Sequence, residues 1–258
     1  MATVKGVDTE ELESKVKHMY KGVAENPHGA YHFEMGRRVA ERLGYSTDVL
    51  NRIPAEAIES FAGVGHYFDL ADLREGEAVL DLGSGSGTDV FYAAVQVGES
   101  GRVVGVDMTP EQLDKAESLR AGAGFDQVEF VNTHIERLPF DDESFDVVVS
   151  NGVINLSPDK QQVFAEIARV LRPGGRAAIA DIIAERHMKE STVCNTELWA
   201  ACIAGAAQRD EYRDAIKAAG LRIGELRENA DYHFISDQAQ EATQTYGVKS
   251  VSFLATKS

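Results

Sequence analysis

Apolar runs alternate with amphipathic stretches through the middle of the chain. Runs rich in Val, Leu, Ile and Ala, as in buried strands, are found at Ala78–Leu82, Arg102–Asp107, Val128–Asn132, Asp146–Ser150 and Arg176–Asp181. Segments with helical periodicity lie between them, at Asp89–Val97, Pro110–Ala123 and Lys160–Leu171. Because apolar strands separated by helices are typical of parallel sheets covered on both faces, the pattern predicts an α/β fold.

The pattern changes after the fifth predicted strand. Residues 189–221 show helical periodicity, and Leu221–Leu226 and Val248–Thr256 are predicted as two further strands. We expect these two strands to have a short connection and to pair antiparallel at the sheet edge. The prediction is therefore a seven-stranded, mostly parallel sheet with an antiparallel last strand and helices on both faces.

The N-terminal part, residues 1–75, differs from the rest. Amphipathic helices are predicted at Thr9–Ala24 and Phe33–Leu43, joined by a turn-rich stretch at residues 25–29. We expect residues 1–75 to form a helical lid over the strand ends of a main domain at 76–258. The lid side chains that we expect to face a pocket are Tyr20, His28, Tyr31 and His32.

The net charge of the chain limits the kinds of partner that it can bind. The 258 residues include 26 Lys plus Arg and 42 Asp plus Glu, for a formal net charge of −16. Binding of nucleic acid needs clustered Lys and Arg, so we expect a small-molecule partner and no nucleic acid. No stretch approaches the roughly 20 apolar residues that span a bilayer, and the N-terminal segment is charged where a signal peptide is apolar. We therefore expect a cytoplasmic protein without a membrane partner.

The sharpest motif is a glycine-rich turn between the first predicted strand and the next helix, Asp81–Gly87. Glycines let backbone N–H groups approach a ligand closely, and the helix N-terminus adds positive partial charge. The spacing is G-x-G-x-G, with Thr88 where a dinucleotide fingerprint requires glycine. The following strand ends at Asp107, where a ribose diol needs an acceptor. The motif predicts a nucleoside cofactor other than NAD.

Two further loops follow the third and fourth predicted strands, at His134–Phe140 and Ser150–Leu156. Because open parallel sheets bind ligands at the carboxyl ends of their strands, we expect both loops to lie at one rim with the glycine turn.

These segments together resemble the class I S-adenosylmethionine-dependent methyltransferases, over about residues 70–185. The matching segments are Asp81–Gly87, Asp107, Ile135–Phe140, Phe145-Asp146 and Arg172–Gly175. The resemblance implies a Rossmann-like fold and S-adenosyl-L-methionine as cofactor. It implies that Asp81 and the loop residues Gly83, Ser84, Gly85 and Gly87 meet the methionine part, and that Asp107 binds the ribose hydroxyls. It also implies that Met108 packs on adenine, that His134 and Ile135 border the adenine edge, and that Asn151 lies near the sulfonium.

The flanking segments resemble one branch of that superfamily, the arsenite methyltransferase-like proteins. The matching segments are Leu43–Tyr45, Ile53-Pro54, Gly63–Gly65, Ser150–Leu156, Leu198–Ala206 and Tyr246–Val251. Cys202 matches an arsenic-binding cysteine of this family. The chain departs from the pattern at Val64, where arsenite methyltransferases carry a cysteine between two glycines.

The acceptor side is predicted from the soft chemistry of arsenic. Trivalent arsenic is thiophilic, and soft ions prefer thiolate ligands. We therefore assign Cys194 and Cys202 to the acceptor side as catalytic residues, with glutathione or another thiol as a further ligand source. We also assign a catalytic role to His32, and we assign no residue to a metal site. Either cysteine could instead be an ordinary core residue.

The favoured function is methyl transfer to thiol-bound trivalent arsenic. Two alternatives stay open. One is methylation of a carbon, oxygen or nitrogen centre of a quinone or other small organic acceptor. The other is a non-catalytic cofactor-binding or metalloid-sensing protein, because a fold does not determine a function.

Overall fold

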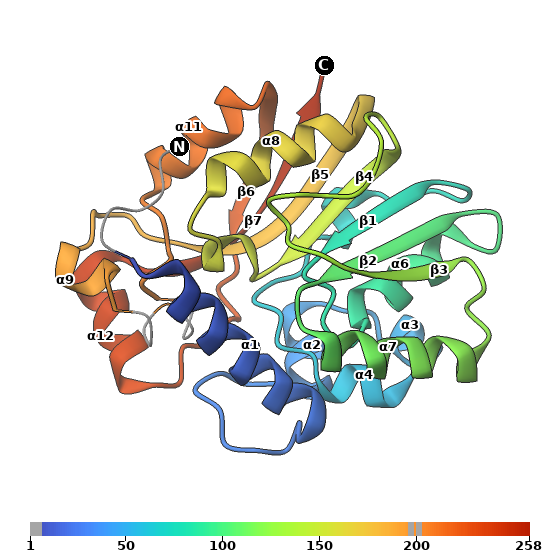
Figure 1. Cartoon of the computed structure of the whole chain (residues 1–258), viewed down its shortest axis with the longest axis horizontal. Helices are drawn as coiled ribbons and strands as arrows, with labels where there is room; N and C mark the ends of the chain where they lie inside the picture. Colours follow the sequence, from blue (N-terminus) through green and yellow to red (C-terminus); the bar gives the residue numbers. More distant parts are fainter. Residues whose placement is uncertain (1–6, 196–198, 200–202) are drawn as a thin grey trace.

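The computed structural model describes residues 7–195, 199 and 203–258. Seven strands in these residues form one sheet in the order β3-β2-β1-β4-β5-β7-β6 (Figure 1). Their bounds are β1 Ala78–Leu82, β2 Arg102–Asp107, β3 Val128–Asn132, β4 Phe145–Asn151, β5 Leu171–Ile183, β6 Leu221–Glu228 and β7 Lys249–Lys257. Strands β1 to β5 pair parallel, and β7 is antiparallel to both β5 and β6. The predicted Rossmann-like sheet with an antiparallel last strand is confirmed.

Helices cover both faces of the sheet (Figure 1). Their bounds are α1 Thr9–Glu25, α2 Arg37–Leu43, α3 Thr47–Leu50, α4 Ala55–Glu59, α5 Phe68–Ala71, α6 Thr88–Val97, α7 Pro110–Ala123, α8 Lys160–Val170, α9 Glu190–Val193, α11 Arg209–Ala218 and α12 Asp237–Tyr246, with a 3₁₀ turn η1 at Ile154–Leu156. One core joins α6 and the N-terminal helices to one face, and a second joins α8 and α11 to the other. Burial on both faces explains why β1, β2 and β4 read as continuous apolar runs.

The region from 189 to 221 differs from its prediction as one helical segment. Helix α9 ends at Val193, and α11 begins only at Arg209. Gln208 caps α11, since its side chain accepts hydrogen bonds from the backbone N–H groups of Asp210 and Glu211. Gly205 precedes this cap and passes so close to the Asn155 carbonyl that a Cβ atom would lie 2.0 Å from its oxygen. The described residues 203–208 just before α11 are not helical.

Two other expectations were wrong in detail. The connection between β6 and β7 is not short, because it contains α12, whose first turn is capped by the Ser236 side chain. The helix predicted from Phe33 begins at Arg37, because Gly36 has φ +87° and stands outside the helix. The pairing of β6 and β7 is antiparallel as predicted, although β7 lies inside the sheet and β6 at the edge.

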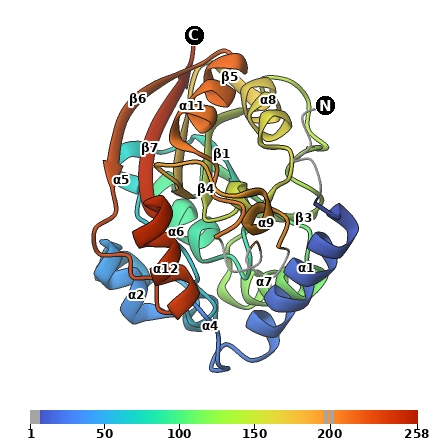
Figure 2. The same cartoon turned by 90° about the vertical axis from the view of Figure 1, so that its left-hand side faces the viewer.

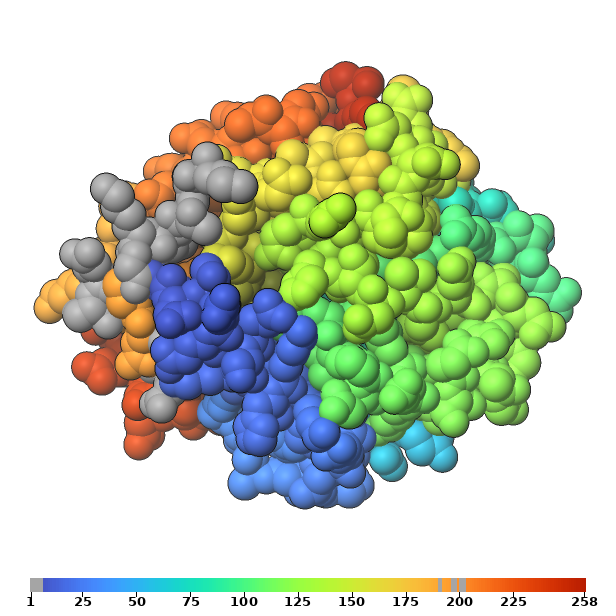
Figure 3. All heavy atoms as spheres, viewed as in Figure 1, coloured from blue at the N-terminus to red at the C-terminus, as the bar shows by residue number. Residues whose placement is uncertain are grey.

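Helix α1 lies beside α7 in both cartoon views (Figures 1 and 2). In the space-filling view, α1 adjoins the green and yellow-green parts of the chain that follow β2 and β3 (Figure 3). Leu12 and Val16 of α1 are buried in the same core as Val79 and Val149 of the sheet. Helix α1 therefore packs at the carboxyl edge of the sheet. Every helix in the described part of the chain is too short or too polar to traverse a lipid bilayer.

Candidate cofactor and acceptor site

A cavity of about 450 Å³ opens at the carboxyl ends of β1, β2, β3 and β4. Its wall is built by α1, by residues 60–63, by the glycine turn and by the loops after β2, β3 and β4. This is the rim that the strand pattern predicted. Nine of the ten predicted cofactor-binding residues line it: Asp81, Gly83, Ser84, Gly85, Asp107, Met108, His134, Ile135 and Asn151.

Gly87 is not among the lining residues. It has φ +94° at the N-cap of α6, and a Cβ atom there would lie 2.8 Å from the Phe91 ring and 2.9 Å from the Phe130 ring. Gly87 thus lets α6 approach β3 closely.

The glycine turn is fixed against β2. The backbone N–H groups of Gly83 and Ser84 both donate to the Val106 carbonyl, at 2.8 and 2.9 Å. Gly83 has φ +72°, and a Cβ atom there would lie 2.3 Å from Val153, so a side chain has no space. Within the described residues, the buried hydroxyl of Ser84 has no hydrogen-bond partner. The turn therefore presents its backbone and the Ser84 hydroxyl to a ligand.

Asp107 links the glycine turn to the start of α7. Its Oδ2 accepts from the Gly85 N–H at 3.0 Å, and its Oδ1 accepts from the Thr109 N–H at 2.8 Å. Burial raises the pKa of this carboxyl, and the backbone hydrogen bonds from Thr109 and Gly85 oppose the rise. Two backbone donors therefore hold the carboxylate at the cavity wall.

The cavity wall is strongly acidic. Asp81, Asp89 and Asp107 line it together with Glu13 and Glu136, and none of its described lining residues is a Lys or Arg. Burial raises the pKa of Asp81 well above its usual value, and the negative charges of Asp89 and Asp107 raise it further. Because a nearby positive charge lowers the pKa of such carboxyls and favours their ionised form, this acidic wall favours a cationic ligand.

Asp89 is a site residue that the sequence analysis missed. It is 6% exposed, and its carboxylate accepts from the hydroxyls of Tyr45 and Tyr67, both at 2.7 Å, and from Asn151 Nδ2 at 3.1 Å. The available signal was its place directly after the glycine turn, in the first turn of α6. The two tyrosines come from distant segments, so no local pattern joins them to Asp89.

Asn151 connects this network to residues 63–65. Its Oδ1 accepts from the N–H of Val64 at 2.7 Å and of Gly65 at 3.3 Å, and its Nδ2 donates to the Gly65 carbonyl at 3.0 Å. The same segment is tied to β7, because Ser250 Oγ donates to the Val64 carbonyl at 2.6 Å. Arg227 of β6 then holds the next residues by donating to the His66 carbonyl at 2.9 Å. Residues 63–66 are thus fixed from both sides.

Cys194 and His32, the described residues among the predicted acceptor residues, are not among the residues that line the cavity. Cys194 follows α9, is partly exposed, and is not among the lining residues. Cys202 lies outside the described residues. Val64, at the family's cysteine position, is 2% exposed and does not line the cavity, whereas its neighbour Gly63 does. The assignment of both cysteines to the acceptor side stays a prediction.

Of the four predicted lid side chains, only Tyr20 is among the lining residues; His28, Tyr31 and His32 are not. Phe33 occupies the space beside Tyr20, with ring centroids 6.2 Å apart. The His32 ring packs edge-on against Phe33, at 4.9 Å between centroids. His32 is not among the lining residues, and its predicted catalytic role stays a prediction.

Comparisons with known proteins agree with this geometry. Residues 73–220 match the family model described as "Methyltransferase domain". The chain is 37% identical over 245 residues to an arsenite methyltransferase of Halobacterium salinarum, covering 89% of this chain and 62% of that one. It thus spans less than two thirds of the length of this relative.

Two solved structures resemble the fold. CrArsM, an arsenic(III) S-adenosylmethionine methyltransferase from Chlamydomonas reinhardtii, is 33% identical, with a TM-score of 0.64 over 86% of this chain and 74% of that chain. The geranyl diphosphate C-methyltransferase of Streptomyces coelicolor, at 17% identity, has a TM-score of 0.69 over 98% of this chain and 100% of its own. The second likeness concerns the fold alone. The chain belongs to the class I S-adenosylmethionine-dependent methyltransferases, in the arsenite methyltransferase-like branch.

Proposed function

We propose that this chain binds S-adenosylmethionine in the cavity and transfers its methyl group to a small molecule, with thiol-bound trivalent arsenic as the favoured acceptor. The observation that carries the proposal is the acidic wall around the glycine turn, where Asp81, Asp89 and Asp107 face one cavity without a Lys or Arg among the described lining residues. S-adenosylmethionine supplies a methyl group on a positively charged sulfur. The lone pair of an acceptor would form a bond to the methyl carbon as the carbon–sulfur bond breaks, and the sulfur would leave as a neutral thioether.

The residues fit such a cofactor. Gly83 and Gly85 add no side chain that would block an approaching ligand, and the Ser84 hydroxyl between them is a buried polar atom without a described protein partner. In our proposal Asp81 and this turn hold the amino-acid part, and Asp107 accepts from the ribose hydroxyls. Met108, His134 and Ile135 then border the adenine, and Asn151 lies at the reactive end. A dry, aligned pocket is sufficient for displacement at a sulfonium, so no strong acid is required.

The arsenic acceptor is supported by the names of the relatives. Both the Halobacterium protein and CrArsM are described as methyltransferases of arsenite or arsenic(III). We propose that Cys194 and Cys202, with glutathione or another thiol, bind the arsenic, because soft ions prefer thiolates.

An organic acceptor is the second candidate, favoured by the chemistry of the cavity wall. The described lining residues include no cysteine, whereas Leu12, Val16, Phe61, Val153 and Leu156 give the wall a large apolar part. Such a surface fits an apolar organic acceptor such as a quinone ring.

We propose that residues 1–75 form a lid that closes over the cavity of a main domain at 76–258. Gln112 of α7 donates through Nε2 to the Tyr20 carbonyl of α1 at 2.8 Å, and His134 Nε2 lies 3.7 Å from Glu13 Oε1. In our proposal these contacts keep α1 over the cavity while water is excluded. We also propose a cytoplasmic location, where thiols stay reduced.

Methyl-labelled S-adenosylmethionine tests the proposal with a panel of acceptors: arsenite with glutathione, and small quinols and phenols. The thiol-bound arsenic acceptor is supported if the label appears on arsenic with the wild-type chain and no longer appears with the double variant Cys194→Ser, Cys202→Ser. Label only on an organic acceptor, unaffected by the double variant, supports the second candidate. Tight cofactor binding without label transfer to any acceptor contradicts methyl transfer and favours the non-catalytic alternative.

A further inference from the structure

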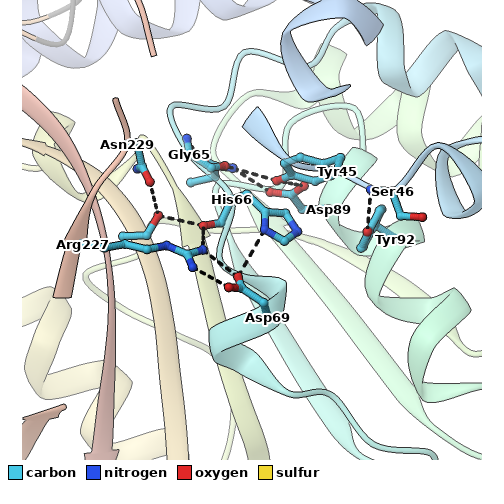
Figure 4. Close-up of polar contacts among 11 residues, drawn as sticks. Tyr45, Ser46, Gly65, His66, Asp69, Asp89, Tyr92, Arg227 and Asn229 are labelled. Atoms are coloured by element: carbon cyan, nitrogen blue, oxygen red, sulfur yellow. Dashed lines mark hydrogen bonds and ion pairs between the residues drawn. The ribbon is translucent and has the colours of Figure 1, made fainter. Parts of the chain in front are cut away.

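Asp89 joins three segments that are far apart in the sequence. Its Oδ1 accepts from Tyr45, which lies between α2 and α3, and its Oδ2 accepts from Tyr67, just before α5. Asn151, the last residue of β4, donates to the same Oδ2 at 3.1 Å. Figure 4 shows Asp89 next to the Tyr45 ring and the Gly65 backbone, above the His66 side chain. The carboxylate thus occupies a junction between the cofactor turn and residues 63–67.

The charge of Asp89 has no compensation from its hydrogen-bond donors. Tyr45, Tyr67 and Asn151 are uncharged, and the negative charge of Asp89 helps to raise the pKa of the nearby Asp81. Burial raises the pKa of Asp89, while the three hydrogen bonds oppose that rise and favour the ionised form. None of the described residues of the cavity wall is a Lys or Arg, so a cationic ligand would supply the positive charge that favours the ionised form of Asp89.

Methyl transfer changes the charge of the ligand in the cavity. S-adenosylmethionine has a sulfonium cation, and its demethylated product, S-adenosylhomocysteine, has a neutral thioether. The two molecules share the same nucleoside and amino-acid parts. A difference in their affinities therefore reports the electrostatics at the sulfur, separately from all other contacts.

We infer that Asp89 makes the cavity distinguish the cationic methyl donor from its neutral product. The inference rests on the proposed function. Asp89 does so as a positioned anion at the cavity wall, and it also acts through Asn151 as a positioning residue. Because its Oδ2 accepts from Asn151 Nδ2, it orients the amide so that Oδ1 faces the N–H groups of Val64 and Gly65. The same carboxylate therefore favours the charged donor and holds residues 63–65 beside it.

Isothermal titration of the full chain with three ligands tests the inference. The ligands are S-adenosylmethionine, S-adenosylhomocysteine and sinefungin, an unreactive analogue with an ammonium in place of the methylsulfonium. We expect Asp89→Asn to lower the affinity ratio of S-adenosylmethionine to S-adenosylhomocysteine by about tenfold, because one nearby charge is lost from a poorly solvated site. Sinefungin should weaken with S-adenosylmethionine, since both carry the positive charge.

Tyr67→Phe is the matched control. It removes one hydrogen bond to Asp89 but keeps the carboxyl group, so we expect it to change the affinity ratio much less than Asp89→Asn does. Asp89→Ser is a second variant without the charge, and it replaces Asp89→Asn if the new asparagine disturbs folding. It should shift the affinity ratio in the same direction.

The outcomes separate this inference from the proposed function. Equal weakening of all three ligands in Asp89→Asn and Asp89→Ser would show that Asp89 has only a structural role, and would overturn the inference while leaving cofactor binding intact. A wild-type chain that binds neither S-adenosylmethionine nor S-adenosylhomocysteine would overturn both.

Discussion

The side-chain amide of Gln112 donates a hydrogen bond to the backbone carbonyl of Tyr20 at 2.8 Å and so joins α7 to α1. Gln112 is 1% exposed, and its Oε1 accepts from the hydroxyl of Ser86 in the glycine turn at 2.5 Å. A single buried side chain therefore connects the helix over the cavity with the turn beneath it. The position of α1 and the shape of the turn are coupled through this amide.

Gln112→Leu should loosen α1. Leucine fills a similar volume but leaves the Tyr20 carbonyl and the Ser86 hydroxyl without these partners, which costs about 1–3 kcal/mol for buried groups. We expect amide hydrogen exchange in residues 9–25 to become about tenfold faster or more, measured by mass spectrometry. Lys21→Ala is the control, because it breaks exposed ion pairs with Glu111 and Glu25 and should change exchange little. Similar exchange in both variants would show that the amide does not hold α1.

Gly83→Ala should destabilise the fold and abolish cofactor binding. The new Cβ atom would lie 2.3 Å from Val153, at a backbone φ of +72° that alanine rarely adopts. We expect a loss of about 1–3 kcal/mol in the free energy of unfolding, measured by urea denaturation. Gly122→Ala is the matched control, since nothing lies within 4 Å of its Cβ position in α7. This substitution should add about 0.5–1 kcal/mol of helix stability. Unchanged stability in Gly83→Ala would contradict the described turn.

Asp181 should make stability depend on pH in an unusual direction. It is fully buried, accepts from the Tyr212 hydroxyl at 2.6 Å, and burial raises its pKa to about 6. Because the folded state then binds its proton more tightly than the unfolded state, this group stabilises the fold at low pH and loses that contribution as the pH rises through about 6.

Comparison with Asp181→Asn isolates this effect. Between pH 4 and 7, we expect the free energy of unfolding of the wild type to fall relative to the variant by up to about 3 kcal/mol, as the linkage relation requires for a shift of this size. Denaturant unfolding of both proteins at a series of pH values measures the difference between their free energies of unfolding. The titration of the other acids cancels in this difference, because both proteins contain them. Parallel pH profiles of the two proteins would refute a raised pKa.

The parts of the fold that were predictable depend on local patterns. Strands β1, β2 and β3 and helix α7 have the predicted bounds, because continuous apolar runs and the Thr109-Pro110 helix start are read from neighbouring residues alone. The non-helical residues 203–208 before α11 were not predictable, since the backbone of Gly205 there lies against the carbonyl of Asn155, which is far away in the sequence.

The site residues also divide into those that local patterns predict and those that depend on tertiary contacts. The rim residues from Asp81 to Asn151 were predictable because parallel strands place their carboxyl ends at one edge. The bonds from Tyr45 and Tyr67 to Asp89 link residues 44 and 22 positions apart across different helices. The exclusion of Gly87 from the wall depends on the rings of Phe91 and Phe130. Such relationships are tertiary, and no spacing in the sequence expresses them.

The most direct measurement is the binding of S-adenosylmethionine to the wild-type chain and to Asp107→Ala, by isothermal titration, together with a crystal structure of the wild-type complex. Binding at one site, weakened at least tenfold in the variant, with the ribose hydroxyls on the Asp107 carboxylate, is the result that we predict. Absence of binding, or a nucleoside held away from Asp107 and the glycine turn, would contradict the central claim.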